Sequence, residues 1–567
     1  MKFVLNEYLS SLKEDGELDS FVKQLIQSMG YIPKSKIQRG RQYGVDISAT
    51  GIDTDSKKKL FLFVIKQGNF SRKNWDSGNI NDIRPSITEI LDVYLTTRVE
   101  KPYDKLPKKI IVCCNGEMET TVQENWAQFV NKHSNDTLEF DFWGVQHLVS
   151  YVNQHQIHEQ AIAPELFLNF RRALSFIDLP DYDLTHFYKF INTLLPISER
   201  ESLTQKQILK KMLLINLCMN IVHKWCEKSD NLKPSYIASE RIILATFNWL
   251  IRNDFIKKRG IFVQFYSMLQ SWQSQNIEYF KKVAKYLTLP ESLGIEVGNF
   301  DEYCLITFEQ IGILSMIGIF ELWECTIQLM QKHDNALIQA KNAFDSASFI
   351  SEILVTIIEN NPSSLSPIYD EHCIEINMGL VLLYETGFFG PAIKWIKEII
   401  NRIILNAKIN KFFPLFVSDP TKLGKEKIEV PKSSQLISFL AEWALILKQS
   451  ESYNILREFI EKELPNLDLQ LWFPDKDVEK YLYSEDASQK AGSTMVNASL
   501  SKNLLLINMH IAEERVLINE EKDFSYNQFG LQFIPFLSSR HFRTYPFPNS
   551  WRDYLRTDFC FNKSENL

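Results

Sequence analysis

The sequence predicts a mixed α/β domain at the N-terminus, followed by a large and mainly α-helical region. Before about residue 160, short apolar segments with strand periodicity alternate with amphipathic segments. From about residue 196 to residue 465 the chain is rich in Leu, Ile, Phe, Lys and Glu, has helical periodicity and contains few turn residues. At 567 residues the chain is too long for one hydrophobic core, so several domains are expected.

The first predicted elements are a helix and a β-hairpin. Apolar residues recur at helical spacing before Gly30, at Leu18, Val22, Leu25, Ile26 and Met29. Residues 44–49 alternate between apolar and polar side chains, which is typical of a half-buried strand and turns Asp46 away from the face packed by Val45 and Ile47. The continuous apolar run 60–65 predicts a central strand buried on both faces.

The remaining elements of this domain alternate between helix and strand. Helices are expected at 87–95, 122–130 and 146–152, and strands at 109–114 and 138–143. The resulting order is a helix, two hairpin-linked strands, a helix, a strand, a helix, a strand and a helix. This order predicts a mixed α/β domain that ends near residue 160.

Changes in composition along the chain divide it into four parts. We expect an α/β domain over residues 1–160, a linker over 161–195 and a helical domain over 196–465. Residues 466–567 combine loops, a helix and an aromatic-rich end. This last part is too aromatic to be a free tail, so it is expected to pack on the helical domain.

Overall composition favours a folded protein in a reducing compartment. Hydrophobic residues make up 45% of the chain and charged residues 23%, so a chain folded nearly end to end is expected. The eight cysteines are scattered without regular spacing and are expected to be buried thiols. The N-terminus has no signal-peptide pattern, and the longest uncharged apolar stretch, Ile311–Phe320, is too short to cross a bilayer. A cytoplasmic protein without a membrane segment is expected.

Positive charge is concentrated near the predicted hairpin, although the chain as a whole carries a net charge of −7. Between Tyr31 and Trp75 there are ten Lys or Arg residues and three acids, a local excess of seven. Such a cluster favours a nucleic-acid ligand, with DNA preferred, although a solvated lysine-rich hairpin is an open alternative. The residues expected to contact nucleic acid are Lys34, Lys36, Arg39, Arg41, Arg72 and Lys73.

The hairpin carries a pattern known from nucleases. Gly44-Val45-Asp46-Ile47, followed by an apolar strand that ends in Lys66, resembles the metal-site hairpin of the PD-(D/E)XK nuclease superfamily. The segment from Leu18 to Tyr31 is similar to the first helix of Mrr-type restriction endonucleases, in which Asp19 falls at the position of an acid that helps to hold the site. The resemblance covers about residues 15–155 and implies a restriction-endonuclease-like fold for the N-terminal domain.

The resemblance implies a divalent-metal site. Asp46 matches the metal-binding aspartate, and Lys66 matches the lysine that orients or deprotonates water. With Asp19 and the carbonyl of Ile65, Asp46 would supply oxygen ligands for Mg²⁺ or Mn²⁺. Val64 stands where the second acid is normally found, and Glu89, in the helix after the hairpin, is the candidate for a displaced acid.

The sequence supports three hypotheses about function. The first is a metal-dependent DNA endonuclease, resembling bacterial anti-phage defence effectors, in which the helical region is a sensor or an oligomerisation platform. The second is a degenerate nuclease fold that binds nucleic acid or protein without catalysis. The third is a helical scaffold whose function lies in protein contacts of residues 196–567, including self-association or a partner protein. Motifs of other enzyme classes are missing, among them GxxxxGK[ST], GxGxxG and GxSxG.

Overall fold

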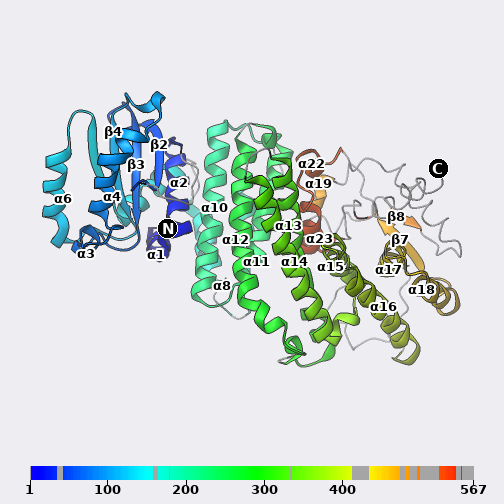
Figure 1. Ribbon diagram of the computed structural model, residues 1–567. Helices are drawn as coiled ribbons and strands as arrows, with labels where there is room; N and C mark the ends of the chain where they lie inside the picture. Colours follow the sequence, from blue (N-terminus) through cyan, green and yellow to red (C-terminus); the bar gives the residue numbers. More distant parts are fainter. Residues whose placement is uncertain are drawn as a thin grey trace, which may run out of the picture. The chain divides into compact units, whose positions relative to one another are not determined.

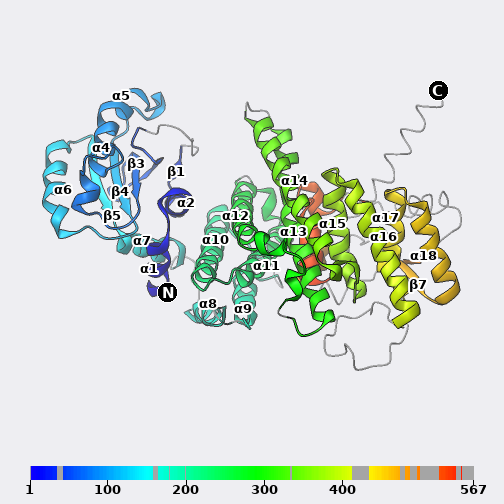
Figure 2. The same ribbon diagram turned by 60° about the horizontal axis from the view of Figure 1, so that its bottom comes forward.

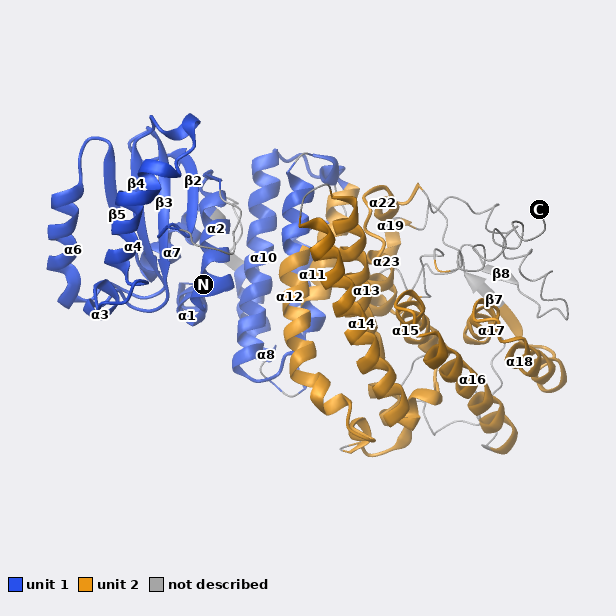
Figure 3. Ribbon diagram, viewed as in Figure 1, with its two compact units in different colours: residues 1–238, 253–268 blue, residues 239–252, 269–567 orange. Residues whose placement is uncertain are grey.

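The chain folds into two compact units. The computed structural model describes residues 2–34, 43–157, 164–177, 179, 181–197, 200–258, 260–295, 297–331, 335–410, 433–472, 479–485, 495–497, 523–544 and 551. The first unit contains residues 1–238 and 253–268, and the second contains residues 239–252 and 269–567 (Figure 3). The first unit begins with an α/β domain, and the second is mostly helical (Figure 1).

A five-stranded mixed sheet forms the centre of the α/β domain. Its strands are β1 (Ile32–Pro33), β2 (Ile47–Ile52), β3 (Lys58–Lys66), β4 (Lys108–Cys114) and β5 (Leu138–Trp143), in the order β1-β2-β3-β4-β5. The pairs β1–β2 and β2–β3 are antiparallel, whereas β3–β4 and β4–β5 are parallel. The sequence-based prediction of a mixed α/β domain is therefore confirmed. β3 and β4 end at the same edge of the sheet, which places the residues that follow them close together.

One face of the sheet is covered by α4 (Ile83–Glu89) and α6 (Thr120–His133), on the opposite side from α2 (Asp19–Ser28) in Figure 2. Side chains of β3 and β4 pack there against apolar residues of both helices. The buried members of this core include Leu60, Leu62, Val64, Ile83, Ile87, Ile110, Val112 and Val122. Each is at most 3% exposed, so this layer is a closed hydrocarbon core.

The other face of the sheet lies under the N-terminal helices and α7 (Val145–Val152). The ring of Tyr31, just after α2, stacks on Phe61 with centroids 4.4 Å apart. Phe63 meets Trp143 edge-to-face at 5.3 Å. Because Phe61 and Phe63 alternate with Leu62 and Val64, β3 is buried on both faces, as its continuous apolar run predicts.

The first strand of the hairpin differs from its predicted span. It runs from Ile47 to Ile52, whereas alternation predicts residues 44–49, and Asp46 lies just before it. Ile47 pairs with Phe63 on one face of the sheet, while Val45 belongs to the core around Val64 on the other. The expectation that Val45 and Ile47 share a face is wrong, because the two residues flank the point where regular strand pairing begins.

Gly44 explains this irregular entry into the hairpin. Its φ of +80° is strained for other residues. A Cβ atom at this position would also lie 2.2 Å from the carbonyl oxygen of Ser86 in α4. Glycine therefore lets α4 approach the hairpin closely, two residues before Asp46.

Helices complete the first unit. The turn η1 (Glu14–Leu18) joins α1 (Lys2–Ser11) to α2. The segment predicted as a linker, residues 161–195, contains α8 (Pro164–Ile177) and α9 (Thr185–Leu194). The two helices are held together by aromatic contacts such as that of Phe170 with Phe190, at 4.9 Å. α10 (Gln205–Lys228) follows, with a Thr204 side chain that caps its first turn.

The second unit is built mainly from helices, and α11 (Lys233–Arg252) and α12 (Ile261–Leu287) each have residues in both units. Its other main helices are α13 (Phe300–Met330), α14 (Ala336–Asn360), α15 (Cys373–Glu385), α16 (Phe389–Leu405), α17 (Leu436–Ile446), α18 (Ser450–Glu463) and α23 (Ile534–Phe542). Small elements accompany them: strands β6 (Ser433–Ser434), β7 (Asp468–Trp472) and β8 (Met495–Asn497), and helices α19 (Glu479–Leu482) and α22 (Ser525–Gln528). The mainly helical character predicted from the sequence is confirmed.

α13 is long and apolar enough to cross a membrane by length and composition alone, and is the single such helix among the described residues. Of its most apolar window, 78% is buried inside the structure, which is also typical of the core helix of a soluble protein. Close helix packing accounts for this burial. A Cβ at Gly318 would lie 2.6 Å from Leu382 of α15, so glycine allows the two helices to touch.

The described aromatic residues near the C-terminus are packed inside the second unit. The ring of Phe533 lies 4.8 Å from Trp323 and 5.0 Å from Phe320, both in α13. Trp551 stacks on Trp443 of α17 at 5.5 Å. Phe533 and Trp551, two described residues of the aromatic-rich end, therefore pack on helices of the second unit.

Candidate active site

The candidate site lies where β3 and β4 end. Ligands of α/β proteins commonly bind at the carboxyl ends of parallel strands, where side chains after neighbouring strands converge. Lys66 is the last residue of β3, and its side chain is 19% exposed. It is therefore open to solvent, in contrast to the closed core below it.

Asp46 is held against the backbone at this end of β3. The N–H of Asp46 donates to the carbonyl oxygen of Phe63 at 2.9 Å. The N–H of Ile65 in turn donates to Oδ2 of Asp46 at 2.6 Å. The structure therefore brings Asp46 to the peptide that leads into Lys66, the two residues that the sequence identifies as the centre of the site.

Burial and nearby charges together shift the pKa of Asp46. Burial raises the pKa of Asp46 to about 6, against the lowering effects of the Ile65 hydrogen bond and the charge of Lys66. The charges of Glu14 and Asp19 raise it further. Asp46 thus lies among two other carboxylates and one lysine, an arrangement that favours a bound cation or a proton.

Glu14 is a member of the site that the sequence analysis missed. Its Oε1 accepts a hydrogen bond from Nζ of Lys66 at 2.8 Å, and its Oε2 accepts one from the N–H of Gln67 at 3.1 Å. Glu14 belongs to η1, in which Asp15 and Gly16 depart from helical geometry. The one signal for it is the acid-rich stretch Glu14-Asp15-Gly16-Glu17, immediately before the amphipathic helix.

Asp19 begins α2 and lies near the site without a direct contact to Lys66 among the described interactions. Its Oδ1 accepts the N–H of Ser20 at 2.6 Å, and burial raises its pKa. Its charge acts on Asp46, so the helix start faces the same region as Glu14. Ile65, proposed as a ligand through its carbonyl, contributes its N–H to Asp46, and its side chain is 1% exposed.

The position of the usual second acid is occupied by hydrocarbon. Val64 is 1% exposed and packs in the core with Ile87 and Val112. Glu89 ends α4, on the helix layer that covers Val64. The charges that shift Asp46 come instead from Lys66, Glu14 and Asp19. Glu14, reaching the site from the N-terminal helices, is thus better placed than Glu89 to replace the missing acid.

The donor set suits a hard divalent cation, because three carboxylates repel one another there and a cation would relieve that repulsion. Both Glu14 oxygens, however, are engaged by Lys66 and Gln67. Among the residues that the structure describes, no three His, Cys, Asp or Glu side chains are grouped closely enough to hold a metal ion. The carboxylates therefore fit Mg²⁺ or Mn²⁺ in chemistry, while the arrangement seen is not a closed cage.

Asn115 fixes the frame around the site. It follows β4, is 2% exposed, and accepts the N–H of Gly68 on its Oδ1 at 2.6 Å. Its Nδ2 donates to the carbonyl oxygens of Leu9 and Leu12 at 3.0 and 2.8 Å. One buried amide therefore ties the loop after β3 to the end of α1. No sequence pattern marks this residue, because its partners lie between 47 and 106 positions away.

The predicted nucleic-acid contacts fall into separate places. Arg72 and Lys73 are exposed in α3 (Arg72–Trp75), shortly after the end of β3. Lys34 is exposed, and its Nζ lies 4.8 Å from the ring centre of Tyr103, in the segment before β4. Lys36, Arg39 and Arg41 lie outside the described residues. Arg72 and Lys73 are thus the predicted cations that follow the same strand end as Lys66.

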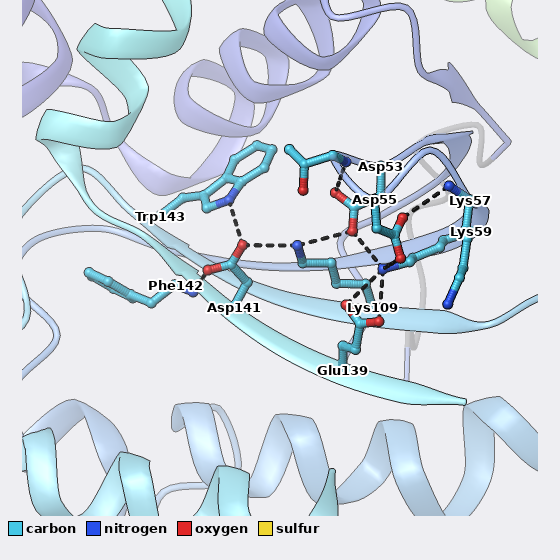
Figure 4. Close-up of polar contacts among 10 residues, drawn as sticks. Asp53, Asp55, Lys57, Lys59, Lys109, Glu139, Asp141, Phe142 and Trp143 are labelled. Atoms are coloured by element: carbon cyan, nitrogen blue, oxygen red, sulfur yellow. Dashed lines mark hydrogen bonds and ion pairs between the residues drawn. The ribbon is translucent and has the colours of Figure 1, made fainter. Parts of the chain in front are cut away.

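One lysine of the basic cluster seen in the sequence is buried. Lys59 lies seven residues before Lys66 on β3, about 23 Å away at about 3.3 Å per residue, and its side chain is 2% exposed. Its Nζ contacts Asp53 at 2.8 Å, Asp55 at 2.9 Å and Glu139 at 2.8 Å (Figure 4). Lys59, one of the ten cations counted in the cluster, is thus buried and paired with acids, and it does not add to an exposed positive surface.

A second lysine extends this buried network. Lys109 of β4 contacts Asp53 and Asp141, each at 3.2 Å, and Asp141 accepts the indole N–H of Trp143 at 3.4 Å (Figure 4). Burial raises the pKa of Asp53, but hydrogen bonds from Lys59 and Thr54 and the charge of Lys109 outweigh it and lower the pKa overall. The network is a structural clamp across the sheet.

Comparisons with known proteins add no family to this description. No protein-family model, curated protein or solved structure matches the chain.

Proposed function

We propose that the N-terminal α/β domain, over about residues 1–160, is a restriction-endonuclease-like nuclease that hydrolyses phosphodiester bonds of DNA. The observation that carries the proposal is the position of Asp46. Its carboxylate is bound to the peptide before Lys66, at the open end of a central strand, with Glu14 and Asp19 acting on it. A buried, charge-crowded carboxylate beside an accessible lysine is typical of a catalytic site.

Each residue has a defined task in this proposal. Asp46, Asp19 and Glu14 would hold Mg²⁺ or Mn²⁺, which when bound neutralises phosphate charge and acidifies water. Hydrolysis joins a water oxygen to phosphorus and breaks one P–O ester bond. Lys66, once free of Glu14, orients that water or stabilises the negative charge that develops on the phosphoryl oxygens. Arg72 and Lys73, exposed after the same strand, contact the phosphate backbone without reading sequence.

The test is cleavage of plasmid, linear duplex and single-stranded DNA by purified full-length protein with Mg²⁺ or Mn²⁺. Two variants address the site, Lys66→Met and Asp46→Asn. The matched control is Lys58→Met, because Lys58 is an exposed lysine at the opposite end of the same strand. We expect Lys66→Met and Asp46→Asn to lower the cleavage rate at least about a hundredfold. Lys58→Met should cleave like the unmodified protein.

Absence of cleavage on all three substrates with either metal, in the unmodified protein and also in the Lys224→Met variant of the next section, would contradict the proposal. So would equal loss of activity in Lys66→Met and Lys58→Met, because that result would indicate a general effect of removing a lysine. An RNA substrate in the same assay decides between DNA and RNA as the target.

A degenerate, non-catalytic nuclease fold is the second candidate. It is favoured by the burial of Val64 in hydrocarbon and by the engagement of Glu14 with Lys66. In that case the domain binds nucleic acid or protein without hydrolysis. Calorimetric titration with Mg²⁺ separates the two, because binding that Asp46→Asn abolishes favours the nuclease, whereas DNA binding without metal binding favours the degenerate module.

The wider setting belongs to the same proposal. An N-terminal nuclease joined to a large helical region suits a cytoplasmic effector of antiviral defence, with helices that sense a signal or form an oligomer. If a chain lacking the nuclease domain kept full biological activity, a helical scaffold would be the better description. Sedimentation of the full chain tests the oligomer.

A further inference from the structure

A single short turn links the candidate site to the helical part of the first unit. Glu14, at the start of η1, contacts Lys66 at 2.8 Å. Glu17, three residues later, accepts a hydrogen bond from Nζ of Lys224 in α10 at 2.6 Å. The same turn therefore carries one acid bound to the site and one bound to a helix outside the α/β domain.

The contact with α10 is better shielded than an ordinary surface ion pair. The side chain of Lys224 is 10% exposed and that of Glu17 is 23% exposed. Oε2 of Glu17 also accepts the N–H of Lys13 at 2.8 Å, so its carboxylate is fixed to the start of the turn. Partial burial reduces screening by water and salt. The energy of this ion pair therefore depends strongly on the distance between its two charges.

Hydrogen bonds fix the segments around η1, whereas η1 itself contains a glycine with a positive φ. Asn115 holds the carbonyl of Leu12 and the N–H of Gly68, on either side of the Glu14–Lys66 contact. Within η1, Gly16 has a φ of +83°, and a Cβ there would meet no atom within 4 Å. The turn therefore has open space at Gly16, the residue type with the widest choice of backbone conformations.

Lys224 already has a second partner. Its Nζ lies 2.7 Å from Glu227 of the same helix, in addition to Glu17. If the contact with Glu17 is lost, Lys224 still pairs with Glu227. The loss therefore does not leave the partly buried charge of Lys224 without a partner. On the other side of the turn, the charge of Lys66 already acts on Asp46, which lies nearby. Both lysines thus have an alternative acid, as a two-state element requires.

We propose that η1 is an inhibitory latch, through which α10 holds Glu14 on Lys66 and keeps the site closed. While Lys224 binds Glu17, Lys66 and Glu14 of the candidate site bind each other. A shift of α10 that separates Lys224 from Glu17 releases the turn and frees Glu14 and Lys66. The consequence for catalysis rests on the proposed nuclease function, but the latch itself is measurable without it.

The test compares two lysines of α10 in the full-length protein. Lys224→Met removes the contact with η1. Lys228→Met is the control, because Lys228 is one turn further along and contacts Glu7 of α1 at 2.8 Å, away from η1. The first readout is hydrogen exchange at the N–H of Gln67, which donates to Glu14. We expect Lys224→Met to speed that exchange roughly tenfold, the size of one lost charged hydrogen bond, and Lys228→Met to leave it within about twofold.

The second readout is Mg²⁺ binding by calorimetry, which should tighten in Lys224→Met and stay unchanged in Lys228→Met. Equal exchange at Gln67 in the two variants would overturn the latch and leave the nuclease proposal standing. Faster exchange at the N–H of Gln67 in Lys224→Met, without Mg²⁺ binding or cleavage in any variant, would support the latch and contradict the nuclease proposal. Weaker Mg²⁺ binding in Lys224→Met would overturn inhibition, because it would make Lys224 a supporting residue of the site.

Discussion

The two ends of β3 carry lysines with opposite roles. Lys59, near the start, is 2% exposed and surrounded by three carboxylates within 2.9 Å. Lys66, at the end, is 19% exposed and contacts one carboxylate, that of Glu14. A buried lysine with several acids can serve only structure, whereas an accessible lysine with one exchangeable partner can meet a ligand. The same residue type on one strand is thus a clamp at one end and a candidate catalytic group at the other.

The largest predicted effect is at the clamp. Replacing Lys59 with methionine leaves Asp53, whose side chain is 5% exposed, with Lys109 as its remaining cation. We expect the free energy of unfolding to fall by about 3 kcal/mol, as when one partner of a buried ion pair is removed. Urea unfolding followed by circular dichroism measures the change. The neighbouring exposed residue provides the control, since Lys58→Met should alter stability by less than about 0.5 kcal/mol. A small effect of Lys59→Met would mean that the network contributes little.

The second prediction concerns Asp46, where a substitution is expected to raise the free energy of unfolding. Its pKa of about 6 in the folded protein lies above the ordinary 3.8, so the folded state binds the proton more tightly. The stabilising contribution of that proton is complete below pH 3.8 and is lost as the pH rises through about 6. Asp46→Asn removes this titration and should therefore stabilise the protein above pH 6, by up to about 3 kcal/mol for a rise of about two pKa units at 1.36 kcal/mol each.

Unfolding free energies at about pH 5 and about pH 8 test this sign, because linkage makes the gain from Asp46→Asn grow with pH. A gain that is constant with pH would indicate a packing effect rather than titration. Stabilisation that accompanies loss of function is also the usual mark of a site where charge has been gathered for a ligand.

The contrast between the two strand ends also shows what the sequence could reveal. The apolar run of β3 and its alternation predicted the central strand, because these are local periodic signals. The approach of Asp46 to Lys66 followed from the resemblance, since a hairpin sets its own register over about twenty residues. The burial of Lys59 among acids could not be predicted, because Glu139 reaches it from β5, two strands away in the sheet and 80 residues along the chain.

Glu14 was missed for a related reason. It reaches Lys66 through a turn in which Gly16 adopts a positive φ, and such a turn has no period to detect. Asp19, one turn away in the first predicted helix, was the residue that the pattern favoured. Its position at the start of α2 is as expected, but the contact with Lys66 belongs to Glu14. Local sequence patterns therefore do not predict long-range contacts that depend on irregular backbone.

The smallest predicted effect on stability is at Lys66 itself. Glu14 is 38% exposed, so solvent screens its pairing with Lys66, and Lys66→Met should change the free energy of unfolding by less than about 1 kcal/mol. The site electrostatics should nevertheless change, because the charge of Lys66 lowers the pKa of Asp46. An NMR titration of the Asp46 carboxyl should therefore give a pKa above 6 in Lys66→Met and an unaltered value in Lys58→Met, whose lysine is at the far end of β3. If Lys66→Met cost as much stability as Lys59→Met, the two strand ends would be equivalent clamps, and the separation of structural from functional lysine would fail.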